Sequence, residues 1–76
     1  MMEEIEDRVL LLGIFKKEAD EKCIEVVHKL EATRLFSLKE GKKRLKNLRK
    51  LGFLEGEVLT LTGVEEAKKV EAEFRL

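Results

Sequence analysis

The sequence predicts a mainly α-helical domain with one small β-hairpin, and three observations support this prediction. Apolar residues recur at helical spacing in four segments of the chain. Between the third and fourth of these, residues 53–62 place β-branched and apolar side chains on both sides of a glycine, which is typical of a tight hairpin. The 76 residues contain no proline, repeat or linker, so residues 1–76 are expected to form a single domain.

The first helix is predicted over residues 4–17. Its apolar side chains extend around almost the whole circumference, which is typical of a helix that is buried on more than one side. Two interpretations remain open. The segment is either a central core helix, or a helix whose spare face packs on a second copy of the chain.

The second helix is predicted from a cap at Asp20 to about Ala32. Four apolar residues on it have the spacing i, i+3, i+4, i+7: Cys23, Val26, Val27 and Leu30. This is the clearest amphipathic pattern in the chain. Residues 33–36 form a short connector that could add one small strand.

The third helix is predicted over residues 37–51. Ser37 followed by Glu40 matches a capping box. Gly41 lies on the same face as the apolar residues Leu38, Leu45 and Leu48. Its placement suggests that another helix approaches closely there. Gly52 is expected to end the helix in a left-handed conformation.

A C-terminal helix is predicted over residues 64–75, after Gly63 breaks the hairpin. Its apolar stripe consists of Val64, Ala67, Val70 and Phe74. This stripe packs either on the domain's own core or on a partner subunit. The core of so short a chain is small and no internal disulfide is possible with one cysteine, so oligomerisation is expected to support it.

Charge is sorted sharply along a chain whose formal net charge is zero. Residues 37–52 contain seven Lys or Arg and one acid, a net charge of +6. Residues 1–36 contain six basic and nine acidic residues and residues 53–76 contain three and six, so each segment has a net charge of −3. A basic surface confined to one helix favours contact with phosphate. A merely solvated helix and an acidic protein partner are the alternatives.

The sequence predicts no catalytic residue, no metal site and no cofactor. It contains no nucleophile–base pair, no paired catalytic carboxylates and no phosphate-binding glycine loop, so an enzyme is not expected. One Cys and one His give no zinc spacing. Cys23 is interpreted as a buried small hydrophobe, with a redox sensor as the alternative. His28 is expected on the surface.

Composition favours a soluble cytoplasmic protein that is not associated with a membrane. The longest apolar run, residues 9–12, is far too short to span a bilayer, and the acidic N-terminus is unlike a secretory signal peptide. Gln, Trp, Tyr and Pro are absent and Asn occurs once, while Lys and Glu are abundant. This is the compositional trend of hyperthermophile proteins and predicts a thermophilic source.

Residues 45–57, which read Leu-Lys-Asn-Leu-Arg-Lys-Leu-Gly-Phe-Leu-Glu-Gly-Glu, resemble the recognition helix and wing of winged helix-turn-helix proteins. Residues 59–63, Leu-Thr-Leu-Thr-Gly, are similar to the returning wing strand. The likeness is greatest to small archaeal and bacterial regulators of the MarR, ArsR and PadR kinds. It implies a three-helix core with a recognition helix at about 37–51, a wing at about 53–62 and a C-terminal helix that often dimerises.

By this resemblance, the chain is expected to be a transcriptional regulator that lays a basic helix in the major groove of double-stranded DNA. The residues expected to face the DNA are Lys39, Lys42, Lys43, Lys46, Asn47 and Lys50. Asn47 is the candidate for a bidentate contact with adenine. A homodimer is expected through the N-terminal helix, the C-terminal helix or both.

A second function remains open, because the wing tip is Glu55-Gly56-Glu57 where a DNA-binding wing commonly carries Arg or Lys. In this alternative the domain is a protein-interaction module or adaptor subunit of a larger complex. Its basic helix then contacts an acidic partner.

Overall fold

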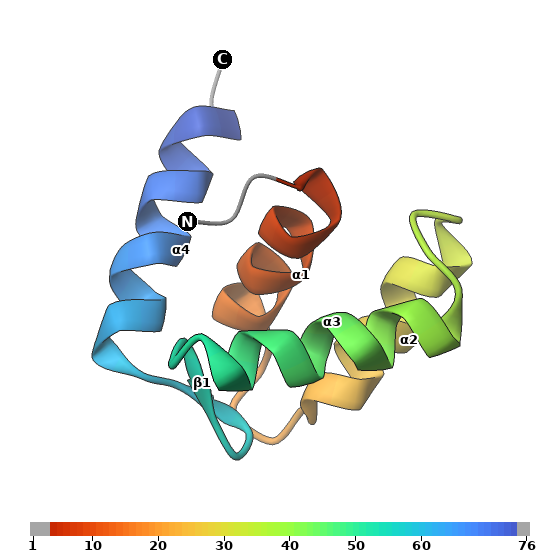
Figure 1. Ribbon diagram of the computed structural model, residues 1–76, viewed down its shortest axis with the longest axis horizontal. Coiled ribbons are helices and arrows are strands. Elements are labelled where there is room, and N and C mark those ends of the chain that lie inside the picture. The colour runs from red at the N-terminus through yellow and green to blue at the C-terminus, as the bar shows by residue number, and fades with distance from the viewer. Residues whose placement is uncertain (1–3, 75–76) are drawn as a thin grey trace.

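The computed structural model describes residues 4–74 and confirms a mainly α-helical fold with one small antiparallel hairpin (Figure 1). The described elements are α1 (Ile5–Lys16), α2 (Cys23–Ala32), α3 (Leu38–Lys50), β1 (Leu54–Glu55), β2 (Val58–Leu59) and α4 (Leu61–Phe74). The predicted order of two helices, a basic helix, a hairpin and a last helix is therefore correct.

Helix α1 is the centre of the fold, because it contacts each of the other three helices. α4 packs against it on one side, and the pair α2 and α3 packs against it on the other (Figure 1). Leu10 and Leu11 of α1 are completely buried. Of the two interpretations of the first helix, a core helix agrees with this packing.

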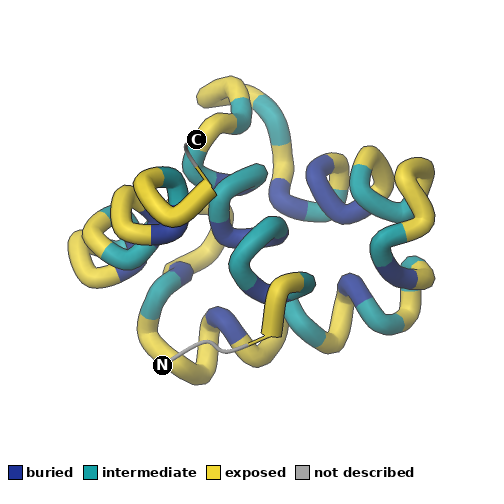
Figure 2. The backbone as a smooth tube through the Cα atoms, turned by 90° about the horizontal axis from the view of Figure 1, so that it is seen from above, coloured by how far each residue is buried: buried dark blue, intermediate teal, exposed yellow. Residues whose placement is uncertain are grey.

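The hydrophobic core takes residues from every helix and from the hairpin. Buried positions recur at intervals along each helix. The other faces of α2, α3 and α4 are largely exposed, whereas most of α1 is buried or half-buried (Figure 2). The largest fully buried side chains are Leu10, Leu11, Leu48, Val27, Val70 and Cys23. The predicted apolar stripes of the second and third helices therefore face the core.

Helix α2 begins at Cys23, so the prediction that Asp20 caps it is wrong. The cap position is Lys22, whose N–H donates to the Glu25 carboxylate at 2.6 Å. The next N–H, that of Cys23, donates to the Glu57 carboxylate at 2.7 Å. Two carboxylates, one of them from the hairpin, thus satisfy N–H groups at the start of α2 that have no carbonyl partner within the helix.

The connector between α2 and α3 forms a turn, so the small strand considered there is absent from the described residues. Arg34 has φ of 65°, a left-handed conformation that cannot continue an extended strand. The Thr33 hydroxyl donates to the Leu30 carbonyl at 2.7 Å and fixes the start of the turn. The buried Phe36 then anchors its end in the core.

Both predicted ends of α3 are confirmed, but only the Ser37 half of the predicted capping box forms, because the Glu40 carboxylate pairs with Arg44. Ser37 Oγ accepts the N–H of Glu40 at 3.1 Å, which caps the first turn. At the other end Gly52 has φ of 82°, and the N–H of Phe53 donates to the Leu48 carbonyl at 3.1 Å. This is the hydrogen-bond pattern of a Schellman cap.

The predicted close approach at Gly41 is also confirmed. A Cβ there would lie 2.5 Å from Val27 Cγ1 and 2.8 Å from Phe36 Cε1. Only a glycine lets α3 pack this closely on α2. The glycine therefore sets how near the basic helix lies to the core.

The hairpin is shorter than predicted and α4 begins earlier, at Leu61. The expectation that a returning strand reaches Thr62 and is broken by Gly63 is wrong. Thr60 caps α4 instead, because its Oγ1 accepts the N–H of Gly63 at 3.1 Å and donates to the Gly52 carbonyl at 2.6 Å. Gly63 is buried against the Phe53 backbone, where a Cβ would overlap the Phe53 carbonyl oxygen.

Candidate nucleic-acid interface

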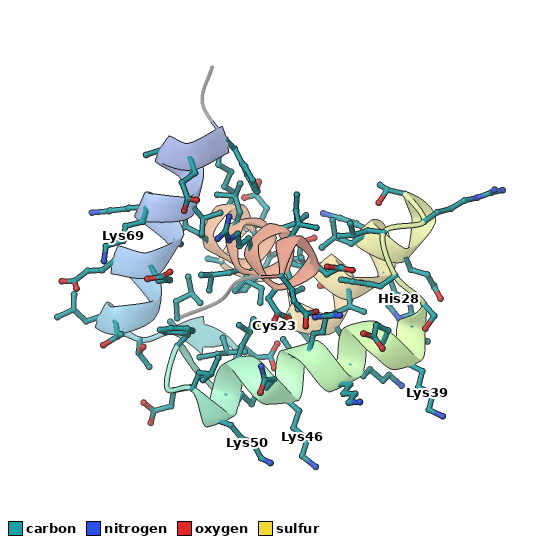
Figure 3. The ribbon with its side chains drawn as sticks, turned by 45° about the horizontal axis from the view of Figure 1, so that its top comes forward. Cys23, His28, Lys39, Lys46, Lys50 and Lys69 are labelled. Carbon is teal, nitrogen blue, oxygen red and sulfur yellow. The ribbon has the colours of Figure 1, made fainter. Side chains whose placement is uncertain are left out.

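Helix α3 turns its apolar side inward and a basic side outward. Leu45 and Leu48 anchor the inner side in the core. The exposed residues of the outer side include every predicted DNA-binding position: Lys39, Lys42, Lys43, Lys46, Asn47 and Lys50. Figure 3 shows Lys39, Lys46 and Lys50 projecting away from the rest of the molecule. We call these six residues the outer face of α3.

The lysines of the outer face have no ionic partner within residues 4–74. No hydrogen bond or ion pair joins any of the five ammonium groups, or the Asn47 amide, to another described residue. Five positive charges therefore stand open to solvent along one helix. Such a field attracts a polyanion and is screened by salt.

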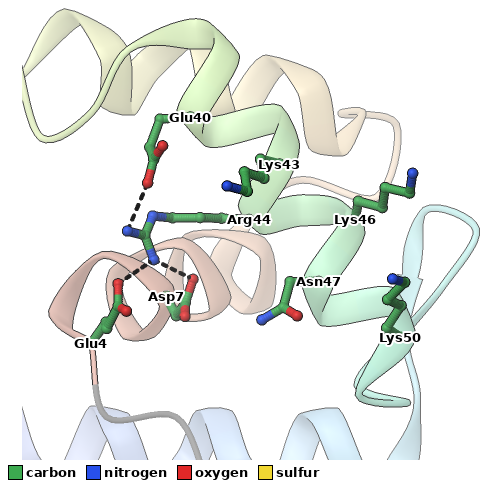
Figure 4. Close-up of a pocket in the computed structure, with 8 residues that line it drawn as sticks. All are labelled: Glu4, Asp7, Glu40, Lys43, Arg44, Lys46, Asn47 and Lys50. Atoms are coloured by element: carbon green, nitrogen blue, oxygen red, sulfur yellow. Dashed lines mark hydrogen bonds and ion pairs between the residues drawn. The ribbon is translucent and has the colours of Figure 1, made fainter.

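Arg44, on the flank of α3 beside α1, has the opposite environment. Its side chain is only 15% exposed and its guanidinium lies 2.7 Å from a carboxylate oxygen of Glu4, 3.0 Å from Asp7 and 2.8 Å from Glu40 (Figure 4). Burial opposes the charged form, but the hydrogen bonds to Asp7 and Glu4 outweigh it and raise the pKa of Arg44. Arg44 thus ties α3 to the start of α1.

Arg49, on the other flank, ties α3 to the hairpin. It donates to the Gly56 carbonyl at 3.2 Å and lies 3.6 Å from a Glu57 carboxylate oxygen. The sequence placed both arginines beside the basic face without assigning partners to them. The spacing of Glu40 and Arg44, i to i+4, was the one local signal that could have revealed an ion pair.

An open hollow of about 490 Å³ lies where the outer face of α3 meets the start of α1 (Figure 4). It is lined by Glu4, Asp7, Glu40, Lys43, Arg44, Lys46, Asn47 and Lys50. Acidic and basic side chains therefore meet at this edge, and Asn47 is the one uncharged residue among them. No partner holds its amide in the described part of the chain.

The two acids of the hairpin tip differ in their surroundings. The Glu57 carboxylate is engaged although half exposed, because the N–H of Cys23 donates to it and lowers its pKa, with Arg49 nearby. Glu55 is exposed and no ion pair engages it among residues 4–74. One carboxylate of the tip is therefore engaged by the fold, and the other, that of Glu55, is free of ion pairs with residues 4–74.

Other titratable groups that the sequence singled out lie apart from this surface. Cys23 is buried, as predicted, and burial raises the pKa of its thiol, with the Glu57 charge acting in the same direction. His28 is exposed, as predicted. Within residues 4–74 no group of His, Cys, Asp or Glu side chains is arranged to hold a metal ion. None of the helices described there is long and apolar enough to cross a membrane.

Comparison with known proteins finds no matching family model, curated protein or solved structure. A function for this protein is therefore inferred from the chemistry of its surface.

Proposed function

We propose that this protein binds double-stranded DNA through α3, laid in the major groove, and acts as a cytoplasmic transcriptional regulator. One observation carries the proposal. The five lysines of the outer face stand in solvent without a carboxylate partner among the described residues, whereas the acids near them are held by arginines. Unneutralised ammonium groups on one helix suit the phosphates of a duplex.

The shape of α3 supports this use. Its 13 residues give a rod about 20 Å long. A helix of this kind fits the major groove, which is about 12 Å wide. The order of helices and hairpin agrees with the winged helix-turn-helix resemblance, in which the helix before the wing is the one that enters the groove.

A homodimer joined through α1 and α4 is part of the proposal. Both helices keep a large apolar side chain partly exposed, Ile5 at 56% and Phe74 at 38%. A second copy would cover these side chains and add the core that a short chain lacks. Two copies of α3 would then contact half-sites about 34 Å apart, one turn of B-DNA.

The test is the binding of a labelled random-sequence duplex at increasing salt. If each α3 neutralises about three phosphates, the dimer should show a slope of log K against log salt near about −5. The double variant Lys43→Ala/Lys46→Ala should weaken binding to every duplex and reduce the slope to about −2. A flat salt response, or unchanged affinity in the double variant, contradicts the proposal.

A matched control is available on α4. Lys68 and Lys69 are exposed and lie on this helix, where Figure 3 labels Lys69. The variant Lys68→Ala/Lys69→Ala removes the same charge as the α3 variant but leaves the outer face intact. It should keep most of the affinity and nearly the whole slope. Equal losses in the two variants would show a response to net charge rather than to α3.

A second candidate function is supported by Glu55, whose free carboxylate on the hairpin would face phosphate unfavourably. In this alternative the domain is an adaptor whose outer face contacts an acidic protein. Retention on a heparin column, followed by a shift assay with duplex DNA, distinguishes the two proposed functions. Sharp retention followed by a duplex shift supports the regulator, whereas passage through heparin and no shift supports the adaptor.

A further inference from the structure

The environment of α3 indicates how it meets a duplex, given that the proposed function holds. We propose that the carboxylates around Arg44 close one flank of α3 to DNA. Contact is then confined to phosphates that face the outer lysines, and Asn47 reads no base. The partner is the duplex backbone, with no contact to a base edge.

The cluster around Arg44 carries a surplus of negative charge. Three carboxylates surround one guanidinium, which leaves two negative charges unbalanced. Asp7 is nearly buried, but the side chains of Glu4 and Glu40 are 62% and 42% exposed. The two exposed carboxylates, Glu4 and Glu40, therefore face solvent at the edge where DNA would arrive and oppose the approach of phosphate there, beside Lys43, which lines the same hollow.

Asn47 lies on this acidic flank. It lines the hollow that Glu4, Asp7 and Glu40 also line. A bidentate contact with adenine requires an amide within hydrogen-bond distance of the base edge, at the floor of the groove. Bringing Asn47 that deep would bring the strand beside it against Glu4 and Glu40, so the acids oppose base reading at this position.

The remaining residues of the outer face are all lysines, which suit phosphate better than base edges. Lys39 and Lys42 do not line the hollow. Lys46 and Lys50 do line it, but they lie on the opposite side of the close-up from Glu4 and Glu40 (Figure 4). A lysine binds phosphate as a compact point charge, without the fork geometry that fixes a base edge. A regulator built in this way discriminates sites by duplex shape and half-site spacing.

The first experiment removes one charge from the acidic flank. Glu40→Gln should strengthen duplex binding by about 2- to 4-fold at low salt, with the gain lost at high salt. Glu65→Gln is the control, because it makes the same charge change at an exposed position of α4. If Glu40→Gln binds no better than Glu65→Gln, the acidic flank does not limit contact and the inference is overturned.

The second experiment compares Asn47→Ala with Lys46→Ala on three duplexes of equal length: alternating A·T, alternating G·C and mixed sequence. Lys46→Ala should weaken binding to all three by the same factor and lower the salt slope by about 1 unit per bound subunit. Asn47→Ala should change each affinity by less than about 2-fold. A change of more than about 5-fold in the ratio between duplexes on Asn47→Ala overturns the inference, since that is the signature of a base contact.

These results are separable from the test of the proposed function. Failure of the unaltered protein to bind any of the three duplexes at low salt removes DNA binding altogether. Binding that depends on Asn47 and on sequence leaves DNA binding intact and removes only the inference about its mode.

Discussion

The outer face of α3 and its two flanks belong to the same helix, yet their positively charged side chains have opposite environments. On the outer face, five lysines have no ionic partner in the described structure. On the flanks, Arg44 holds three carboxylates, and Arg49 holds the hairpin through Gly56 and Glu57. The same helix therefore carries one set of cations that stabilise the fold and another that contributes nothing evident to it.

The difference follows the chemistry of the two side chains. A guanidinium is planar, weakly hydrated and able to donate several hydrogen bonds at once, so it suits a crowded, partly buried ion cluster. An ammonium group is strongly hydrated and loses more when it is removed from water. The arginines at the flanks therefore suit a structural role in ion pairs. The lysines on the outer face suit contact with a ligand.

The largest effect should come from breaking the Arg44 cluster. Arg44→Ala leaves the nearly buried Asp7 carboxylate without its cation and releases the start of α1 from α3. Removing one partner of such a pair costs about 3 kcal/mol of the free energy of unfolding. Thermal or urea denaturation measures the loss, which should lower the Tm by more than about 10 °C.

Arg34→Ala is the control for this variant, because Arg34 is exposed and forms no ion pair within residues 4–74. Its removal should change the free energy of unfolding by less than about 0.5 kcal/mol. An Arg44→Ala protein as stable as Arg34→Ala would contradict the division between structural arginines and available lysines.

The sequence alone predicted the helices, their order and the outer face of α3, because these depend on local periodicity and caps. Ser37 and Gly52 are examples, since each acts on the helix that it adjoins. The sequence did not predict what depends on residues far apart in the chain. Glu57 accepts a hydrogen bond from the N–H of Cys23, 34 residues away, and no pattern within either segment predicts that contact.

The start of α4 was missed for the same reason. The threonines of residues 59–63 read locally as a strand that ends at a glycine. Thr60 becomes a helix cap because its hydroxyl also reaches Gly52, and Gly63 is required by the Phe53 backbone packed against it. For the candidate site, the exposed residues were predicted correctly from the sequence, but the acids that border them were not, since Glu4 and Asp7 lie at the start of α1, far away in the chain.

A smaller effect is expected at the hairpin, where Glu57 links Arg49, on one flank of α3, to the start of α2. Glu57→Ala removes the carboxylate that accepts the Cys23 N–H and lies near Arg49. Loss of such a cap costs about 1 kcal/mol at neutral pH. The variant should also release the hairpin, which native-state hydrogen exchange of residues 54–59 would detect as faster exchange.

The pH dependence of this variant tests the cause. The folded state lowers the pKa of Glu57, chiefly through the Cys23 N–H, so the carboxylate contributes stability above the pKa that it has in the unfolded chain. That contribution is lost as the pH falls through the lower, folded value. The stability gap between the unaltered protein and Glu57→Ala should therefore be largest near pH 7 and narrow below about pH 4. A gap that stays constant down to pH 3 would assign the effect to packing.

The smallest expected effect is a gain in the free energy of unfolding, whereas the preceding variants lose stability. It tests directly whether the lysines of the outer face differ from the arginines of the flanks. Lys43 and Lys46 each stand three or four residues from other lysines on α3, and like charges at that spacing destabilise a helix. The Lys43→Ala/Lys46→Ala protein should therefore be more stable than the unaltered one by about 0.5 kcal/mol at low ionic strength, with the gain screened by salt. Denaturation at two salt concentrations measures it. If the variant gains stability but loses duplex binding, these charges lower the stability of the fold and serve binding. A loss of stability would instead show that the two lysines are structural residues, as Arg44 is.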